Sequence, residues 1–238
     1  MEIKEPTTYL FYAAVPLPQG DHSKASRAEA VRRAHEGAWS LLATSLHLLD
    51  PERFPGSAAD QLPAVEKGVY GKPAFCDRSL PEFSLSHSGS FVVCAVSECG
   101  PIGVDIQEMT PWDGYPKMDD IVTRFFHPKE QEYYFSHEDP GKRCRIFYQI
   151  FSCKEAYVKL TGLGLSEEFP GFYTLFDEKE MPAGIFEDES DRALGFPVLT
   201  KLPAQDICGH YSLASCTYQP LPEPELRRVL LNGEEENQ

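Results

Sequence analysis

The chain has 238 residues and a formal net charge of −15, with 37 acidic residues against 22 lysines and arginines. This length can bury a real core, in one large domain or two small ones. The acidic balance argues against general nucleic-acid binding, and no apolar run is long enough to span a bilayer. An anionic ligand would therefore need a local cluster of cations.

The first half predicts a strand near residues 8–15, an amphipathic helix near 25–49 and irregular Pro-rich chain as far as Pro63. The apolar run from Tyr9 to Val15 stops at Pro16 and has no basic leader, so we expect a first strand and not a signal peptide. Further strands are predicted near residues 73–76, 82–86, 90–97 and 101–107.

The last of these strands holds the first candidate for metal chemistry. Its apolar residues alternate with Gly103, Asp105 and Gln107, so Asp105 and Gln107 project from the same face. Gly103 leaves room for a ligand or a neighbouring backbone to approach closely. The alternative interpretation is an edge strand with a solvated polar face.

The second half predicts helices near residues 116–125, 128–137 and 142–161, then strands near 171–176 and 205–217 with a weaker one near 183–187. On the last helix Phe151, Glu155 and Lys159 are spaced i, i+4, i+8 and share one side. Glu155 and Lys159 could form an ordinary surface pair worth a few tenths of a kcal/mol. Alternatively, Glu155 borders an apolar stripe, where a carboxylate is costly unless it is paired or binds a metal. Lys154 and Lys159 could then hold phosphate oxygens.

Several motifs occur in an order that resembles the 4′-phosphopantetheinyl transferase superfamily. They are Ser86-His87-Ser88, Gly103-Val104-Asp105-Ile106-Gln107, and Lys154-Glu155-Ala156 with Lys159. The chain length and Tyr70-Gly71-Lys72-Pro73 resemble the larger, surfactin-activating (Sfp-type) branch. The similarity runs from about residue 70 to residue 166 and includes Arg124-Phe125-Phe126 with Glu130. Before residue 70, only Arg33 on the predicted long helix invites comparison.

The resemblance implies an α+β fold in which two similar α/β subdomains pack side by side with the ligand cleft between them. We expect the N-terminal subdomain to span 1–108 and the C-terminal subdomain 109–219. The acidic tail, 220–238, is expected to be disordered.

The resemblance also implies the reaction. A serine of an acyl or peptidyl carrier protein would attack the phosphorus next to the pantetheine of coenzyme A, and 3′,5′-ADP would leave. Mg²⁺ would be held by Asp105 and Glu155, with Gln107 as a further ligand, and Lys159 would stabilise phosphate charge. Either Glu155 or Glu130 would take the serine proton. The residues implied in coenzyme A binding are Arg33, Lys72, Ser86, His87, Lys154 and Lys159.

Two positions depart from the family pattern. Gln107 stands where the family usually has Glu, so the metal site would lose one negative charge and bind Mg²⁺ more weakly. Phe151 replaces the usual Trp, an exchange of one core aromatic residue for another.

Three functions are compatible with the sequence: an active transferase, a non-catalytic homologue that binds coenzyme A or a carrier protein, and an unrelated Mg²⁺-dependent phosphohydrolase. The third is disfavoured because no cluster of three or four acidic ligands is present. Seven cysteines without zinc-site spacing predict packed thiols in a reducing compartment. We therefore expect a cytoplasmic monomer that acts in fatty acid, polyketide or nonribosomal peptide biosynthesis, with no nucleic-acid or membrane partner.

Overall fold

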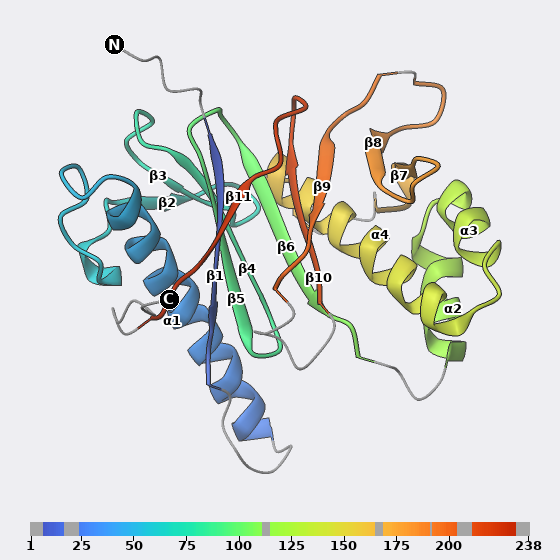
Figure 1. Cartoon of the computed structure of the whole chain (residues 1–238), viewed down its shortest axis with the longest axis horizontal. Coiled ribbons are helices and arrows are strands. Elements are labelled where there is room, and N and C mark those ends of the chain that lie inside the picture. Colours follow the sequence, from blue (N-terminus) through green and yellow to red (C-terminus); the bar gives the residue numbers. More distant parts are fainter. Residues whose placement is uncertain are drawn as a thin grey trace.

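The computed structural model describes residues 7–16, 24–110, 115–164, 169–190, 192–203 and 211–231. Its α+β fold contains two main sheets and two small hairpins (Figure 1). The first sheet has the order β11 (Glu225–Arg228), β1 (Thr8–Ala14), β5 (Phe91–Ser97), β4 (Glu82–Ser88). The second has the order β6 (Ile102–Glu108), β10 (Tyr211–Thr217), β9 (Phe196–Thr200). The hairpins pair β2 (Val65–Lys67) with β3 (Pro73–Phe75), and β7 (Tyr173–Phe176) with β8 (Pro182–Phe186).

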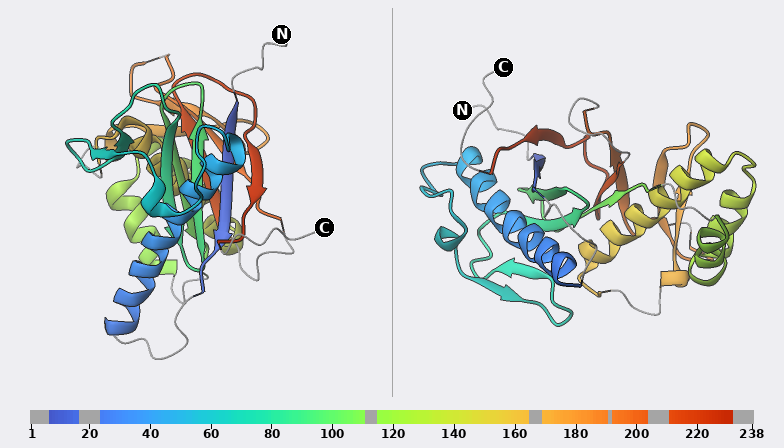
Figure 2. Two further views of the ribbon diagram at one scale, coloured as in Figure 1. Left: turned by 90° about the vertical axis from the view of Figure 1, so that its left-hand side faces the viewer. Right: turned by 90° about the horizontal axis from the view of Figure 1, so that it is seen from below.

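Two long helices flank the strands from opposite sides (Figure 2, right). Helix α1 (Lys24–Leu49) packs on the first sheet, and α4 (Pro140–Thr161) packs on β6 and β10 of the second. The shorter helices α2 (Tyr115–Phe125) and α3 (Pro128–Phe135) lie beside α4, together with the β7–β8 hairpin (Figure 1). Single 3₁₀ turns span Ala59–Gln61 and Phe169–Gly171. Within the described residues, no helix is both long enough and apolar enough to cross a membrane.

Strand β1 is buried on both faces, which explains why its sequence is almost wholly apolar. Phe11 and Ala13 belong to the core beneath α1, whereas Leu10 and Tyr12 belong to the core shared with the second sheet. Because successive side chains of a strand point to opposite faces, a strand between two cores shows no polar alternation. The second core also contains Val104 of β6, so the two sheets share one apolar interior.

The two sheets meet where the edges of β4 and β6 face each other. The hydroxyl oxygens of Ser84, Ser86 and Ser88 accept hydrogen bonds from backbone N–H groups of β6. The donors are Val104 at 3.1 Å, Ile106 at 3.4 Å and Glu108 at 2.9 Å. The spacing of two residues places all three hydroxyls on one side of β4. In this contact between β4 and β6, which we call the β4–β6 seam, serine hydroxyls therefore accept the hydrogen bonds that backbone carbonyl groups accept elsewhere in a sheet.

Most predicted elements are confirmed with shifts of a few residues at their ends, including the long helices α1 and α4 and strands β1, β4, β5 and β6. The predicted strand near 205–217 corresponds to β10, and its residues 205–210 lie outside the described residues. Strands β2, β9 and β11 were not predicted. β9 contains Pro197 and lies at a sheet edge, where a missing backbone donor is tolerated.

The prediction that 220–238 is disordered is wrong for the part that the structure describes. Glu225–Arg228 forms β11, which pairs in parallel with β1. Val229 is buried in the core beneath α1, and Leu231 packs against that core. The prediction rested on the acidic composition of the tail and did not consider these few apolar residues, which pack against the core. Residues 232–238, with the run of glutamates, lie outside the described residues.

Gly103 lets α4 approach β6 directly. A Cβ added at this position would overlap the carbonyl oxygen of Ala156 and lie 2.5 Å from the backbone nitrogen of Leu160. Both obstacles belong to the helix backbone, which cannot move aside as a flexible side chain would. The expectation that Gly103 admits a neighbouring backbone is therefore confirmed.

We predict that Gly103→Ala lowers the free energy of unfolding by about 3 kcal/mol, because the added methyl group forces α4 away from the sheet. The measurement is urea unfolding followed by circular dichroism. Gly171→Ala is the matched control, since a Cβ there meets no atom within 4 Å. Equal stability of the two variants would show that α4 does not rest on Gly103.

Candidate active site at the junction of β4, β6 and α4

Asp105 is the centre of a buried polar cluster and is only 2% exposed. Its Oδ1 accepts hydrogen bonds from Lys159 Nζ at 2.7 Å and from Ser86 Oγ at 2.8 Å. Its Oδ2 accepts one from Gln107 Nε2 at 2.7 Å. A carboxylate offers about four lone-pair positions. Three are occupied here, which leaves one on Oδ2 for a further ligand.

Local periodicity assembles this cluster. Asp105 and Gln107 lie on the same face of β6, and Glu155 and Lys159 lie one helical turn apart on α4. The contact of α4 with β6 then brings both pairs together. The sequence predicted these four residues as one site, and the structure groups them through the contacts of Asp105 and Lys159 and the charge interaction of Asp105 with Glu155.

Glu155 is buried, and its Oε1 has no hydrogen-bond partner among the described residues. Burial, and to a smaller extent the negative charge of Asp105, raise the pKa of this carboxyl to about 7, although the positive charge of Lys159 opposes both effects. A buried carboxylate oxygen without a partner is costly. Such an atom fits a site whose remaining ligand is a cation or a proton.

The described residues contain no group of three or more His, Cys, Asp and Glu side chains arranged to hold a metal ion. Mg²⁺, however, is commonly held by only one or two carboxylates together with substrate phosphates and waters. The free position on Asp105 Oδ2 and the unpartnered Oε1 of Glu155 fit such a site. Gln107 turns its amide nitrogen toward Asp105, so only its amide oxygen could serve as a ligand.

His87 is exposed at the end of β4, near the cluster. Its partial burial, with the positive charges of Lys159 and His35, lowers the pKa of its imidazole, while Asp105 acts in the opposite direction. His35 of α1 was not singled out from the sequence, because an exposed histidine on an amphipathic helix carries no motif. His87 therefore remains a candidate for contact with an anionic ligand beside Lys159.

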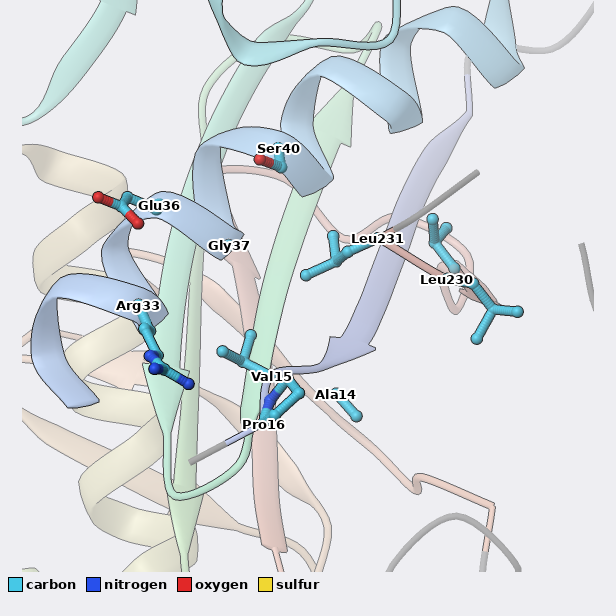
Figure 3. A pocket seen from close by; sticks show the side chains of 10 residues that line it. Ala14, Val15, Pro16, Arg33, Glu36, Gly37, Ser40, Leu230 and Leu231 are labelled. Carbon is cyan, nitrogen blue, oxygen red and sulfur yellow. The ribbon is translucent and has the colours of Figure 1, made fainter. Parts of the chain in front are cut away.

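Arg33 lies elsewhere on α1 and lines a pocket of about 470 Å³ with Val15, Pro16 and Leu231 (Figure 3). Its Nε donates a hydrogen bond to Glu29 Oε1 at 2.7 Å. Among the described residues, the structure gives Arg33 no contact with Asp105 or Lys159. The role of Arg33 in coenzyme A binding stays a prediction.

Lys72 bridges the beginning of β6 and the end of α4. Its Nζ donates to the backbone carbonyls of Ile102 at 3.2 Å and Leu160 at 3.0 Å. Burial lowers the pKa of its ammonium group. Two of the three N–H donors of Lys72 are used in this way, and its contact with coenzyme A stays a prediction.

The roles predicted for Lys154 and Glu130 are contradicted by their burial. Both side chains are completely inaccessible, and Lys154 Nζ donates to Glu130 Oε2 at 2.8 Å. Glu130 also accepts hydrogen bonds from the backbone N–H groups of His127 and Thr174. Lys154 lies 4.5 Å from the ring centroid of Phe172. This buried pair ties α3, α4 and the start of β7 together and cannot reach a ligand or a carrier protein.

Phe151 packs in the aromatic core between α4 and the Phe169–Gly171 turn. Its ring centroid lies 6.1 Å from that of Phe147 and 5.9 Å from that of Phe169. The prediction that this residue is a core aromatic is confirmed.

We predict an inverse pH dependence of stability from Glu155 in the metal-free protein. Its pKa is about 7 when folded and near 4.5 when unfolded. Between these values the folded protein keeps a proton that the unfolded chain has lost, so the free energy of unfolding falls as the pH rises. Glu155→Gln has no titratable group at this position, so its stability does not fall in this way. We expect its free energy of unfolding, relative to that of the wild type, to be about 2 kcal/mol higher at pH 8 than at pH 5.

The measurement is urea unfolding of the wild type and the variant in EDTA at both pH values. Glu132→Gln, at an exposed position on α3, is the control and should shift stability equally at both. A Glu155→Gln effect that does not change with pH would contradict the buried, protonated carboxyl.

Most residues of this cluster lie in a region that is similar to known proteins. The family model described as "4′-phosphopantetheinyl transferase superfamily" matches residues 101–210, which include Asp105, Glu155 and Lys159. A putative 4′-phosphopantetheinyl transferase from Synechocystis is 42% identical over 101 residues, covering 42% of this chain and 39% of the relative. A 4′-phosphopantetheinyl transferase from Bacillus subtilis is 39% identical over 105 residues, covering 43% of each chain.

The match to a third relative is longer. The 4′-phosphopantetheinyl transferase psf-1 from Bacillus pumilus is 33% identical over 159 residues, covering 61% of this chain and 63% of the relative. A crystal structure of a holo-(acyl-carrier-protein) synthase from Bacillus anthracis in complex with CoA (3′,5′-ADP) also matches. It is 19% identical, covers 49% of this chain and 92% of that chain, and gives a TM-score of 0.37.

Over residues 101–210 the chain is similar to the 4′-phosphopantetheinyl transferase superfamily. Its similarity to the Bacillus relatives supports a resemblance to the Sfp-type branch. The match to the first curated relatives spans 39–43% of their length.

Proposed function

We propose that the protein transfers 4′-phosphopantetheine from coenzyme A to a serine of an acyl or peptidyl carrier protein, releases 3′,5′-ADP and depends on Mg²⁺. One observation supports this most strongly: the unpartnered Oε1 of buried Glu155 lies in the same cluster as Asp105 and Lys159. The matching relatives named as 4′-phosphopantetheinyl transferases supply the reaction class.

Lys159 supplies positive charge for the phosphate oxygens. Its ammonium group has three N–H donors, of which Asp105 and Ser86 accept two. Its side chain is 29% exposed, so the third donor can reach a ligand that enters from solvent. In-line phosphoryl transfer depends chiefly on positioning and charge neutralisation, which a fixed ammonium group provides.

Asp105 and Glu155 would hold the metal through Oδ2 and Oε1, respectively, with Gln107 beside them. A Mg²⁺ ion bound there would neutralise charge on the pyrophosphate of coenzyme A. The two carboxylates, together with Lys159, set the direction from which the pyrophosphate can approach. The net charge of −15 makes this local cation necessary, because the rest of the molecule repels anions.

Glu155 accepts the proton of the attacking serine. A general base must lie within hydrogen-bond reach of the proton that it takes, and Glu155 lies in the cluster with Asp105 and Lys159. The serine oxygen forms a bond to the phosphorus next to the pantetheine, the bond from that phosphorus to the oxygen of 3′,5′-ADP breaks, and the serine proton passes to Glu155. Glu130, the other base considered from the sequence, is fully buried against Lys154.

We also propose the finer organisation implied by the family. The chain would divide into similar subdomains, 1–108 and 109–219, with the ligand between them. Strand β6 of the first range pairs with β10 of the second, so a sheet crosses that division, and β11, which lies beyond residue 219, pairs with β1. A cytoplasmic monomer is the form that we propose. All six cysteines in the described residues are free thiols, as a reducing compartment requires.

The alternative is a homologue that binds coenzyme A or a carrier protein without transfer. Gln107 is the observation that favours it. The amide nitrogen of Gln107 satisfies Asp105 without a metal ion, and the site carries one negative charge fewer than a second carboxylate at this position would give it. The two functions differ in whether phosphopantetheine reaches the carrier.

We predict that Lys159→Ala slows transfer by about 10²-fold, because it removes a positioned charge from the phosphates. The protein is incubated with coenzyme A, Mg²⁺ and an apo-carrier protein, and the carrier is weighed intact by mass spectrometry. Lys142→Ala is the matched control, since Lys142 lies on the same helix, is 30% exposed and also pairs with a carboxylate, Glu180. It should transfer at the wild-type rate.

Equal rates for the Lys159 and Lys142 variants would rule out the phosphate role of Lys159. A wild-type protein that binds coenzyme A but leaves the carrier mass unchanged would establish the non-catalytic alternative. Melting temperatures of both variants exclude a trivial loss of fold.

A further inference from the structure

Ser86 uses its whole hydrogen-bonding capacity inside the protein. Its hydroxyl donates to Asp105 Oδ1 at 2.8 Å and accepts from Lys159 Nζ at 2.7 Å and the Ile106 N–H at 3.4 Å. A serine hydroxyl offers one donor and two lone pairs, so none remains for a ligand. The side chain is also only 6% exposed. The expectation that Ser86 binds coenzyme A directly therefore conflicts with its contacts.

The contact with Lys159 has a geometric consequence. An ammonium group held by a single acceptor rotates about its terminal bond, so its other two N–H groups have no fixed direction. Two acceptors, Asp105 and Ser86, stop that rotation. The third N–H of Lys159 then points in one direction, set by protein atoms before any ligand arrives. Positioning of this kind reduces the entropy lost on forming the productive complex.

Neighbouring serines on the same strand lack this arrangement. Ser84 and Ser88 accept the N–H groups of Val104 and Glu108, at 3.1 and 2.9 Å, and these are their only side-chain hydrogen bonds among the described residues. All three serines therefore close the β4–β6 seam, but Ser86 alone of the three also contacts an acidic and a basic side chain. Its bond to the seam is the longest of the three, so the seam depends least on Ser86.

The geometry points to Ser86 as a positioning residue that fixes the direction of the Lys159 ammonium group and the orientation of Asp105, without contacting substrate. Its effect on catalysis rests on the proposed transferase function. Its effect on Lys159 does not, because it follows from contacts within the free protein.

The first test observes the ammonium group itself. In protein labelled with ¹⁵N-lysine, the Lys159 NH₃⁺ resonance is assigned by its loss in Lys159→Arg, and its order parameter is measured by relaxation. Ser86→Ala should lower that order parameter by at least twofold, whereas Ser84→Ala should leave it unchanged. Buried Lys154, which is tied to Glu130, serves as an internal reference. An unchanged Lys159 order parameter in Ser86→Ala would overturn the proposal.

The second test measures transfer kinetics. Ser86→Ala should lower kcat for phosphopantetheine transfer roughly tenfold, as expected for the loss of a hydrogen bond to a charged group, with a smaller change in KM. Ser84→Ala should keep kcat within twofold, although it loses the shorter seam bond. If kcat falls equally in both variants, the effect of Ser86 comes from its hydrogen bond between β4 and β6, and the positioning role is wrong.

A second pair of variants guards against a fold defect. Ser86→Thr and Ser86→Val have nearly the same shape, suit a strand and differ by the hydroxyl. The Thr variant should retain both the order parameter of Lys159 and kcat, whereas the Val variant should lose both. If the wild type transfers nothing, the proposed function fails, while the order parameters still decide the role of Ser86. Thr and Val variants with the same order parameter would contradict the positioning role.

Discussion

The packing of the α4 backbone against β6 at Gly103 is the contact on which the rest of the site depends. Glu155 and Lys159 lie one turn apart on the helix, and Asp105 lies two residues beyond Gly103 on the strand. A larger residue at position 103 would separate the two elements, because helix backbone atoms occupy the space of its Cβ. The absence of a side chain at position 103 therefore sets the distance between the strand that carries Asp105 and the helix that carries Glu155 and Lys159.

The cluster contains two carboxyl groups but only one ammonium group. Asp105 forms an ion pair with Lys159, whereas Glu155 lies near the like charge of Asp105 and has an oxygen without a hydrogen-bond partner. Burying two carboxylates with one ammonium group favours uptake of either a proton or a cation. Lys154 and Glu130 show the opposite case on the same helix, since that pair is closed, fully buried and complete. Helix α4 therefore carries one ion pair that is partly exposed at Lys159 and another that is fully buried.

How much the sequence could predict depended on whether a feature is set by local periodicity. The alternation of β6 and the four-residue spacing on α4 fix which side chains share a face, so Asp105, Glu155 and Lys159 could be found. The partners that come from distant segments of the chain could not be predicted from such spacing. Lys154 stands next to Glu155 in the sequence, but successive helical residues point about 100° apart, and Lys154 meets Glu130 in the core instead. Lys72 and Ser86 were likewise predicted to contact coenzyme A, while their partners in the structure, on β6 and α4, depend on tertiary packing.

The metal position offers the most direct test of this account. Crystals grown with coenzyme A and Mn²⁺ in place of Mg²⁺ would be measured for anomalous scattering at the manganese edge. We predict one strong peak within coordination distance of Asp105 Oδ2 and Glu155 Oε1, with the pyrophosphate of coenzyme A and Lys159 Nζ on the same side. Bound coenzyme A with its manganese peak away from both carboxylates would contradict it.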